Sequence, residues 1–88
     1  MDHPYRVFVF KNAKKVLARI PKHIRLKLEA AIFHLELEPY MGIKMHGELS
    51  YLRKIRIMNY RIIYKVVDLE LLIQVIEINS RGNVSYDR

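Results

Sequence analysis

Apolar residues alternate with basic or aromatic ones along residues 51–64, on both sides of a short link at Met58-Asn59. Alternation with a period of two is typical of a half-buried β-strand. Two such runs around a short link that contains asparagine predict a β-hairpin. Counting outward from the link gives the expected opposed pairs: Ile57 with Tyr60, Arg56 with Arg61, Ile55 with Ile62, and Lys54 with Ile63.

The predicted hairpin gathers positive charge on one side. Directly opposed residues share a face of a sheet, and so do residues two apart on a strand. Lys54, Arg56 and Arg61 therefore project from one face, while Arg53 alternates to the other. Like charges opposed across a ladder are destabilising, so we expect this cluster to contact something anionic.

The rest of the chain predicts one α+β domain over residues 1–88. Apolar residues recur at three- and four-residue steps in two segments that are bounded by Pro21 and Pro39, which indicates two amphipathic helices. The expected elements are a strand at 5–10, helices at 11–19 and 22–37, a loop at 40–50, the hairpin, a strand at 71–78, a turn at 80–83 and a possible brief strand at 84–86. This order predicts a helical hairpin packed on one face of a small, twisted antiparallel sheet.

Composition narrows the class of protein. The formal net charge of +7 favours nucleic acid, an anionic membrane surface or an acidic protein as partner, although charge for solubility alone gives the same total. The absence of cysteine excludes disulfides and thiolate metal sites. The four histidines lack metal-ligand spacing, and no apolar run reaches the roughly 18 residues of a membrane span. We therefore expect a cytoplasmic protein without a metal.

Lys22 and Arg25 lie in the first turn of the predicted helix at 22–37, where the helix dipole disfavours cations. One interpretation is that this basic helix start contacts phosphates. The other is that both charges are exposed and screened. Together with Lys44 in the loop and Arg53, these residues are the candidate RNA- or ribosome-binding residues outside the central cluster.

The basic hairpin face is the main candidate site, because the chain contains no Gly-rich phosphate loop, HExxH pair or nucleophile elbow. The strand at 71–78 is expected to return beside the hairpin, which brings Arg81 to the Arg61 end. Guanidinium groups bind phosphate bidentately, and Tyr86 can stack on an unpaired base. Four cations and a tyrosine therefore favour RNA as the ligand.

Cleavage of RNA is chemically possible at such a face, because the ribose 2′-OH is itself the nucleophile. Clustered cations stabilise the extra charge of the transition state. Neighbouring arginines favour the neutral form of Lys54, which would let it act as a base. Arg81 suits electrostatic stabilisation rather than proton donation, because a guanidinium keeps its proton. A binding surface without catalysis is the alternative interpretation.

Three segments carry a resemblance to a known family: Lys44-Met45-His46-Gly47, the run from Lys54 to Tyr64, and the closing Arg81 and Tyr86. With the order strand–helix–helix–strands, they resemble the RelE/ParE toxin superfamily over nearly the whole chain. Tyr60-Arg61-Ile62-Ile63-Tyr64 is the most specific part. The resemblance implies a toxin of a type II toxin–antitoxin system, neutralised by a cognate antitoxin that wraps around it. We expect that antitoxin to be RelB-like and acidic.

The family has two main activities. RelE-type members are ribosome-dependent endoribonucleases that cut mRNA in the A site without a metal or other cofactor, and ParE-type members poison DNA gyrase. The first activity implies mRNA and a 70S-type ribosome as partners. By the resemblance, the catalytic roles are activation of the 2′-OH and binding of the phosphate by Lys54 and Arg56, transition-state stabilisation by Arg61, leaving-group assistance by Arg81, and base orientation or stacking by Tyr86.

The chain departs from the family pattern in places. Met58 stands where a glycine is usual in the hairpin turn, and the C-terminal helix of some relatives has no counterpart after Tyr86. His46 is either a loop histidine or a base of the kind that other subfamilies use, and Tyr60 and Tyr64 are expected in the core. The resemblance therefore favours an mRNA endonuclease. The competing hypothesis is a ParE-like gyrase inhibitor, or a non-cleaving toxin-fold protein that keeps antitoxin binding and operon repression.

Overall fold

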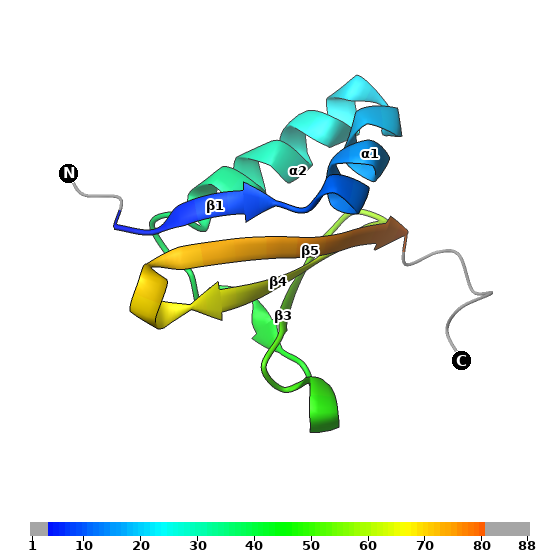
Figure 1. The fold of residues 1–88 in the computed structure, drawn as a ribbon. Coiled ribbons are helices and arrows are strands. Elements are labelled where there is room, and N and C mark those ends of the chain that lie inside the picture. Colours follow the sequence, from blue (N-terminus) through cyan, green and yellow to red (C-terminus); the bar gives the residue numbers. More distant parts are fainter. Residues whose placement is uncertain (1–3, 81–88) are drawn as a thin grey trace.

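The computed structural model describes residues 4–80, which form an α+β fold of two helices and a five-stranded sheet (Figure 1). The elements in chain order are β1 (Arg6–Val9), α1 (Lys11–Arg19), α2 (Lys22–His34), β2 (Ile43–Lys44), β3 (Arg53–Ile57), β4 (Tyr60–Val67) and β5 (Leu72–Ser80), with single 3₁₀ turns at Gly47–Leu49 and Asp68–Glu70. The predicted helix at 11–19 is confirmed. The second helix is shorter than expected and ends at His34, after which the chain continues as turns toward Pro39.

The sheet has the order β1-β5-β4-β3-β2 and is mixed. The prediction of a purely antiparallel sheet is wrong at one edge, because β1 pairs in parallel with β5, from Arg6 opposite Leu72 to Val9 opposite Val75. The two helices carry the chain across one face between β1 and the rest of the sheet, so β1 has no hairpin partner next to it in sequence. It pairs instead with the last strand, which runs in the same direction.

The hairpin of β3 and β4 has the predicted register: Ile57 opposite Tyr60, Arg56 opposite Arg61, Ile55 opposite Ile62, and Lys54 opposite Ile63. The two-residue loop needs a positive φ at its first position, which favours glycine. Met58 takes this conformation with φ of 56°. The methionine at a usual glycine position therefore leaves the register of the hairpin unchanged.

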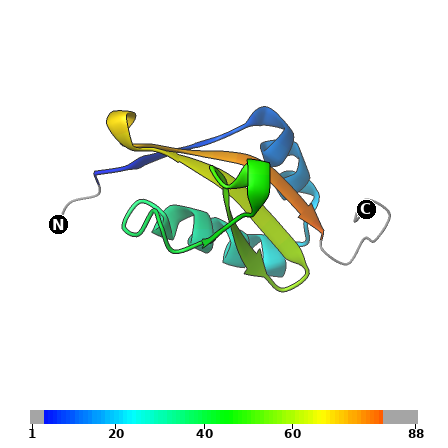
Figure 2. The ribbon, with the colours of Figure 1, turned by 90° about the horizontal axis from the view of Figure 1, so that it is seen from below.

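Both helices cover the same face of the sheet, and the core lies between the helices and the sheet (Figures 1 and 2). Apolar side chains of the two layers are buried against each other: Ala13, Ile20, Leu28, Ile32 and Leu35 from the helices and their ends, and Ile62, Tyr64, Ile73, Val75 and Ile78 from the sheet. Tyr64 is fully buried and Tyr60 packs against this core, so their predicted place in the core is confirmed. The opposite face of the sheet has no helix over it within residues 4–80.

Strand β5 contains an irregularity that shifts its pairing with β4 between Ile63 and Tyr64. On one side of the shift Tyr64 faces Val75, and on the other Ile63 faces Glu77. One extra residue, Ile76, therefore lies in β5, as in a β-bulge. The predicted end of this strand at residue 78 was too early, because β5 continues to Ser80. The remainder of the predicted turn at 80–83 and the brief strand at 84–86 lie outside the described residues.

Asp68, in the turn between β4 and β5, joins three parts of the chain. Tyr5 at the start of the chain donates a hydrogen bond to Asp68 Oδ1 at 2.6 Å, and Tyr40 after α2 donates to the same oxygen. The hydrogen bonds from Tyr40 and Tyr5 hold the pKa of the Asp68 carboxyl below its ordinary value of 3.8. The charged form of Asp68 is thus the one that the fold favours.

This coupling predicts a pH dependence of stability. The carboxyl has a lower pKa in the folded state than in the unfolded chain, so its contribution is present above the ordinary value of 3.8 and is lost as the pH falls through the folded-state value. We expect Asp68→Asn to lower Tm at neutral pH. The difference in Tm between this variant and the wild type should shrink as the pH falls below 3.8. Thermal denaturation of both proteins between about pH 7 and pH 3 measures it. A Tm difference that stays constant over this range would contradict the coupling.

Candidate functional site

The candidate site lies on the sheet face turned away from the helices. Lys54 and Arg56 of β3 and Arg61 of β4 project from it, with Arg56 directly opposite Arg61 in the ladder; we call these three residues the basic face. Arg56 is exposed, whereas Lys54 and Arg61 are half-buried. The predicted gathering of the three cations on one side is confirmed, and their catalytic roles stay predictions.

A chain of hydrogen bonds fixes one edge of the Arg61 guanidinium. Arg61 Nε donates to Asn79 Oδ1 at 3.1 Å, and Asn79 Nδ2 donates to Glu77 Oε2 at 2.7 Å. Both partners belong to β5, on the same face of the sheet as Arg61. A guanidinium held in one orientation loses less freedom when it binds phosphate than a mobile one. Arg61 is therefore preorganised toward β5.

Asn79 is a site residue that sequence analysis missed, because of the irregularity in β5. Counting back from the turn at Asp68–Glu70 with Val67 opposite Leu72 places Ile78 opposite Arg61. The extra residue moves the register by one, so Asn79 takes that position. The available signal was the polar pair Asn79-Ser80 at the end of an otherwise apolar strand.

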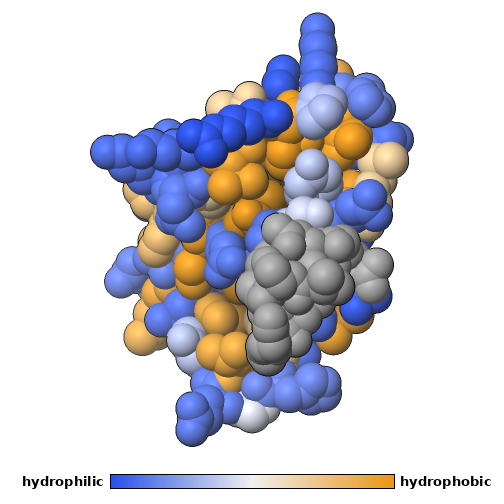
Figure 3. Space-filling model, turned by 90° about the vertical axis from the view of Figure 1, so that its right-hand side faces the viewer, coloured by the Kyte–Doolittle hydropathy of each residue, from blue (hydrophilic) through white to orange (hydrophobic). Residues whose placement is uncertain are grey.

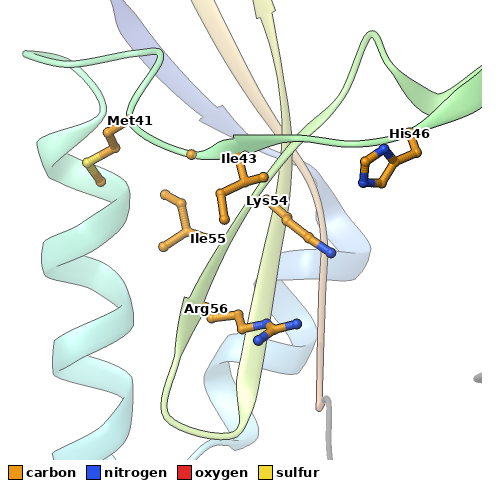
Figure 4. Close-up of a pocket in the computed structure, with 7 residues that line it drawn as sticks. Met41, Ile43, His46, Lys54, Ile55 and Arg56 are labelled. Carbon is orange, nitrogen blue, oxygen red and sulfur yellow. The ribbon is translucent and has the colours of Figure 1, made fainter.

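Beside the basic face, a hollow with a volume of about 490 Å³ opens at the edge of β3 (Figure 4). Its lining comes from the loop after α2, from β2 and from β3: Met41, Gly42, Ile43, His46, Lys54, Ile55 and Arg56. In Figure 4 the Lys54 and Arg56 side chains extend to the same side, while Met41 and Ile55 lie toward the helix. The hollow therefore has a cationic side and an apolar side. Sequence analysis did not predict that the loop at 40–50 lines a hollow. The strand within it, β2, has only two residues, which is too short to show the alternation of apolar and polar residues that marks a strand.

The wall formed by the loop is held rigidly by Tyr64. The Tyr64 hydroxyl donates to Pro39 O at 2.8 Å and accepts a hydrogen bond from Gly42 N at 2.9 Å. A Cβ at Gly42 would lie 2.6 Å from the Tyr64 hydroxyl oxygen and 2.9 Å from Lys54 O, which is closer than real Cβ atoms approach. Only glycine therefore lets the loop approach β3 this closely.

Arg53 also holds this loop from the other face of the sheet. Its Nη1 donates to Gly42 O at 2.8 Å and to Tyr40 O at 3.2 Å, and its guanidinium lies 4.9 Å from the centre of the Tyr40 ring. These contacts give Arg53 a structural role beside the hollow. Its predicted role as an RNA- or ribosome-binding residue stays a prediction.

The structure does not bring Lys22, Arg25 or Lys44 to the basic face. Lys22 and Arg25 lie in the first turns of α2, on the helical side of the sheet, where Arg25 Nη1 donates to Ile20 O at 3.0 Å. Lys44 is exposed on β2 and pairs with Arg53, on the other face from Lys54. Arg81 and Tyr86 lie outside the described residues, so their predicted convergence with Arg61 stays a prediction.

Two general features of residues 4–80 complete the description. Their His, Asp and Glu side chains form no group of three or more that could hold a metal ion. In the same part of the chain, neither helix is long and apolar enough to cross a membrane.

Solved structures of toxins share this fold. A RelBE2 toxin–antitoxin complex from Mycobacterium tuberculosis matches with 25% identity and a TM-score of 0.80, over 89% of this chain and 99% of that one. An archaeal RelE–RelB complex from Pyrococcus horikoshii OT3 matches with 28% identity and a TM-score of 0.75, over 91% and 98% of the two chains. The isolated Escherichia coli RelE toxin, 18% identical over 92% and 88% of the chains, has a TM-score of 0.78 and shows a likeness of fold alone. The fold is thus that of the RelE/ParE superfamily of toxins.

The family assignment follows from the sequence comparison. The family described as ParE toxin of type II toxin–antitoxin system, parDE, matches residues 5–84. Since this match spans most of the chain, the protein belongs to that family, and the expected RelE/ParE membership and α+β fold are confirmed. A comparison with curated proteins found no match. The protein is therefore a toxin of a type II toxin–antitoxin system.

Proposed function

We propose that this toxin is a ribosome-dependent endoribonuclease that cleaves mRNA in the ribosomal A site and so stops translation in the cytoplasm. The observation that carries the proposal is the basic face, where Lys54, Arg56 and Arg61 share one side of the sheet and Asn79 orients Arg61. The mutual repulsion of three adjacent cations destabilises the ladder. A phosphodiester backbone offsets that repulsion.

In the proposed reaction the ribose 2′-oxygen attacks the neighbouring phosphorus, and the bond from phosphorus to the 5′-oxygen breaks. The products are a 2′,3′-cyclic phosphate and a 5′-hydroxyl. Lys54 accepts the 2′-OH proton, and Arg56 binds a non-bridging phosphate oxygen. Arg61 stabilises the additional charge of the pentavalent transition state. Arg81 stabilises the leaving 5′-oxygen, which takes up a proton from water, and Tyr86 stacks on the adjacent base.

We further propose that residues 1–88 act as one toxin domain and that a RelB-like antitoxin neutralises it. The solved relatives that are 25% and 28% identical are complexes of a toxin with its antitoxin, in both cases of the RelB–RelE kind. The net charge of +7 favours an acidic antitoxin. Such a partner would cover cations that otherwise contact RNA.

A direct test adds the purified toxin to 70S ribosomes that carry a defined mRNA and maps the cut ends by primer extension. We expect cuts within the A-site codon, and little cleavage of the same mRNA without ribosomes. The weak activity on naked RNA follows from the lack of a dedicated strong base at the site. Rapid cutting of naked RNA, or intact mRNA on the ribosome, would contradict the proposal.

The second candidate function is inhibition of DNA gyrase. It is favoured by the description of the matched family as ParE toxins. A supercoiling assay with purified gyrase, run on the same toxin preparation, separates the two functions. Loss of supercoiling with intact ribosome-bound mRNA would establish the gyrase function and overturn the endonuclease proposal.

A further inference from the structure

We propose that the hollow beside the basic face is a binding subsite for a nucleobase of the RNA, and that Ile43 and Met41 form its stacking wall. The inference rests on the proposed function and adds to it the residues that read the sequence at the cut. The volume of about 490 Å³ lies within the range of roughly 300–1,000 Å³ that small-ligand pockets span. Figure 4 shows Ile43 between the two cations and the apolar side chains of Met41 and Ile55.

The first observation is the exposure of large apolar side chains at the hollow. Ile43 is 67% exposed and Met41 37% exposed, although both are apolar. Hydrophobic surface is scattered over this protein, and Figure 3 shows some of it (orange) between hydrophilic side chains on the side where β5 ends. Single exposed apolar residues are normal. Ile43 and Met41 differ because they line one concavity together with Lys54 and Arg56.

Charge complementarity identifies the occupant. A nucleotide has a flat base with apolar faces next to an anionic phosphate, and the hollow has an aliphatic wall next to two cations. Enzymes that take a base out of its stack hold it between apolar or aromatic side chains, and a methionine sulfur makes favourable contacts with an aromatic ring. A base placed against Ile43 would leave its phosphate beside Lys54 and Arg56, where the proposed cleavage takes place.

The edge of β3 supplies hydrogen-bonding groups for such a base. Within residues 4–80, β2 pairs with β3 only at Arg53 and Lys54. Leu52 O accepts a hydrogen bond from Met45 N, and Lys54 O lies next to Gly42, so the even-numbered peptide groups of β3 point to this edge. The next peptide group that points to this edge belongs to Arg56, which lies beyond the residues that pair with β2. Its N–H and C=O offer one donor and one acceptor to the edge of a base.

A peptide strand is a poorer occupant of the same place. An extended peptide binds a sheet edge through several successive main-chain hydrogen bonds. Past β2, only Ile55, Arg56 and Ile57 of β3 remain, and alternation turns only the Arg56 peptide group toward the hollow. Before Ile43 the loop is held by Tyr64, which binds Pro39 O and Gly42 N, and it does not continue as a strand along β3. One peptide group is enough to form hydrogen bonds with the edge of a base, whereas an added peptide strand would need several such groups in succession.

The test measures cleavage and binding separately. In the ribosome assay we expect Ile43→Ser to raise KM about tenfold, with little change in kcat, and to alter which nucleotide is preferred beside the cut. Leu69→Ser is the matched control, because Leu69 is 99% exposed in the turn at Asp68–Glu70 and lies outside the hollow. Unchanged KM and unchanged nucleotide preference in Ile43→Ser would overturn the inference.

Binding is followed by NMR of isoleucine methyl groups in the wild-type protein. The probe is a dinucleotide whose first sugar lacks the 2′-OH, so it cannot be cleaved. We expect shifts at Ile43 and Ile55 and none at Ile20, which is buried at the end of α1. Shifts produced by an acidic peptide and not by the dinucleotide would overturn the inference in favour of a protein-binding surface. If the wild type fails to cleave mRNA, the proposed function fails, while this experiment still decides whether the hollow binds a base.

Discussion

Arg61→Ala is expected to slow ribosome-dependent cleavage by about 10²–10³-fold, the loss typical of removing one preorganised donor to a transition-state oxygen. Arg61 lies opposite Arg56 on the basic face, and its guanidinium is oriented by Asn79. The substitution removes the positive charge from the place where the phosphorane charge develops. Single-turnover cleavage on programmed ribosomes measures the effect, and growth arrest in cells should be relieved in parallel.

Lys15→Ala is the matched control for this substitution, because Lys15 is an exposed cation on α1, on the helical side of the sheet. It removes the same unit charge and should cleave at the wild-type rate. Arg61→Lys keeps the charge but loses the planar donor set, so we expect a rate between those of the alanine variant and the wild type. If growth arrest persists in Arg61→Ala and is accompanied by DNA damage, the gyrase function is the correct one.

Tyr64→Phe is expected to lower the free energy of unfolding by about 1–3 kcal/mol, the usual penalty when buried polar groups lose their hydrogen-bond partner. The Tyr64 hydroxyl serves both Pro39 O and Gly42 N, and the tyrosine is fully buried. The substitution removes a single oxygen and leaves the ring in the core. Urea denaturation of the two proteins measures the difference.

Tyr51→Phe provides the control, because Tyr51 is 59% exposed. That variant should unfold at nearly the wild-type urea concentration. Since the loop at 39–42 forms one wall of the hollow, Tyr64→Phe should also weaken cleavage more than Tyr51→Phe does. Equal stabilities of the two variants would show that the hydroxyl of Tyr64 does not anchor the loop.

The central hairpin could be predicted from sequence because its information is local. A two-residue link at Met58-Asn59 sets every pair by counting, and alternation then places Arg56 and Arg61 on one face. The helix at Lys11–Arg19 was equally accessible, because its apolar spacing is regular and Pro21 follows it. Elements whose partners are adjacent in sequence were therefore the ones predicted correctly.

The features that sequence analysis missed depend on contacts between distant segments. The parallel pairing of β1 with β5 leaves no local signal, and a β-bulge in β5 decides that Asn79 rather than Ile78 faces Arg61. The hollow requires Gly42 to touch Tyr64, a contact that spacing does not reveal. Residue types made the basic face predictable, whereas the groups that position it become apparent only in the folded chain.

The parallel pairing of β1 with β5 has a consequence for the synthesis of this toxin. A ribosome releases β1 and both helices well before the last strand exists, so the sheet of a nascent chain stays incomplete until residue 80 has emerged. Asn79 is made at the same late moment. A product of premature termination before Leu72 would therefore lack both the neighbour of β1 and the side chain that aligns Arg61, and we expect it to be harmless to the cell that makes it.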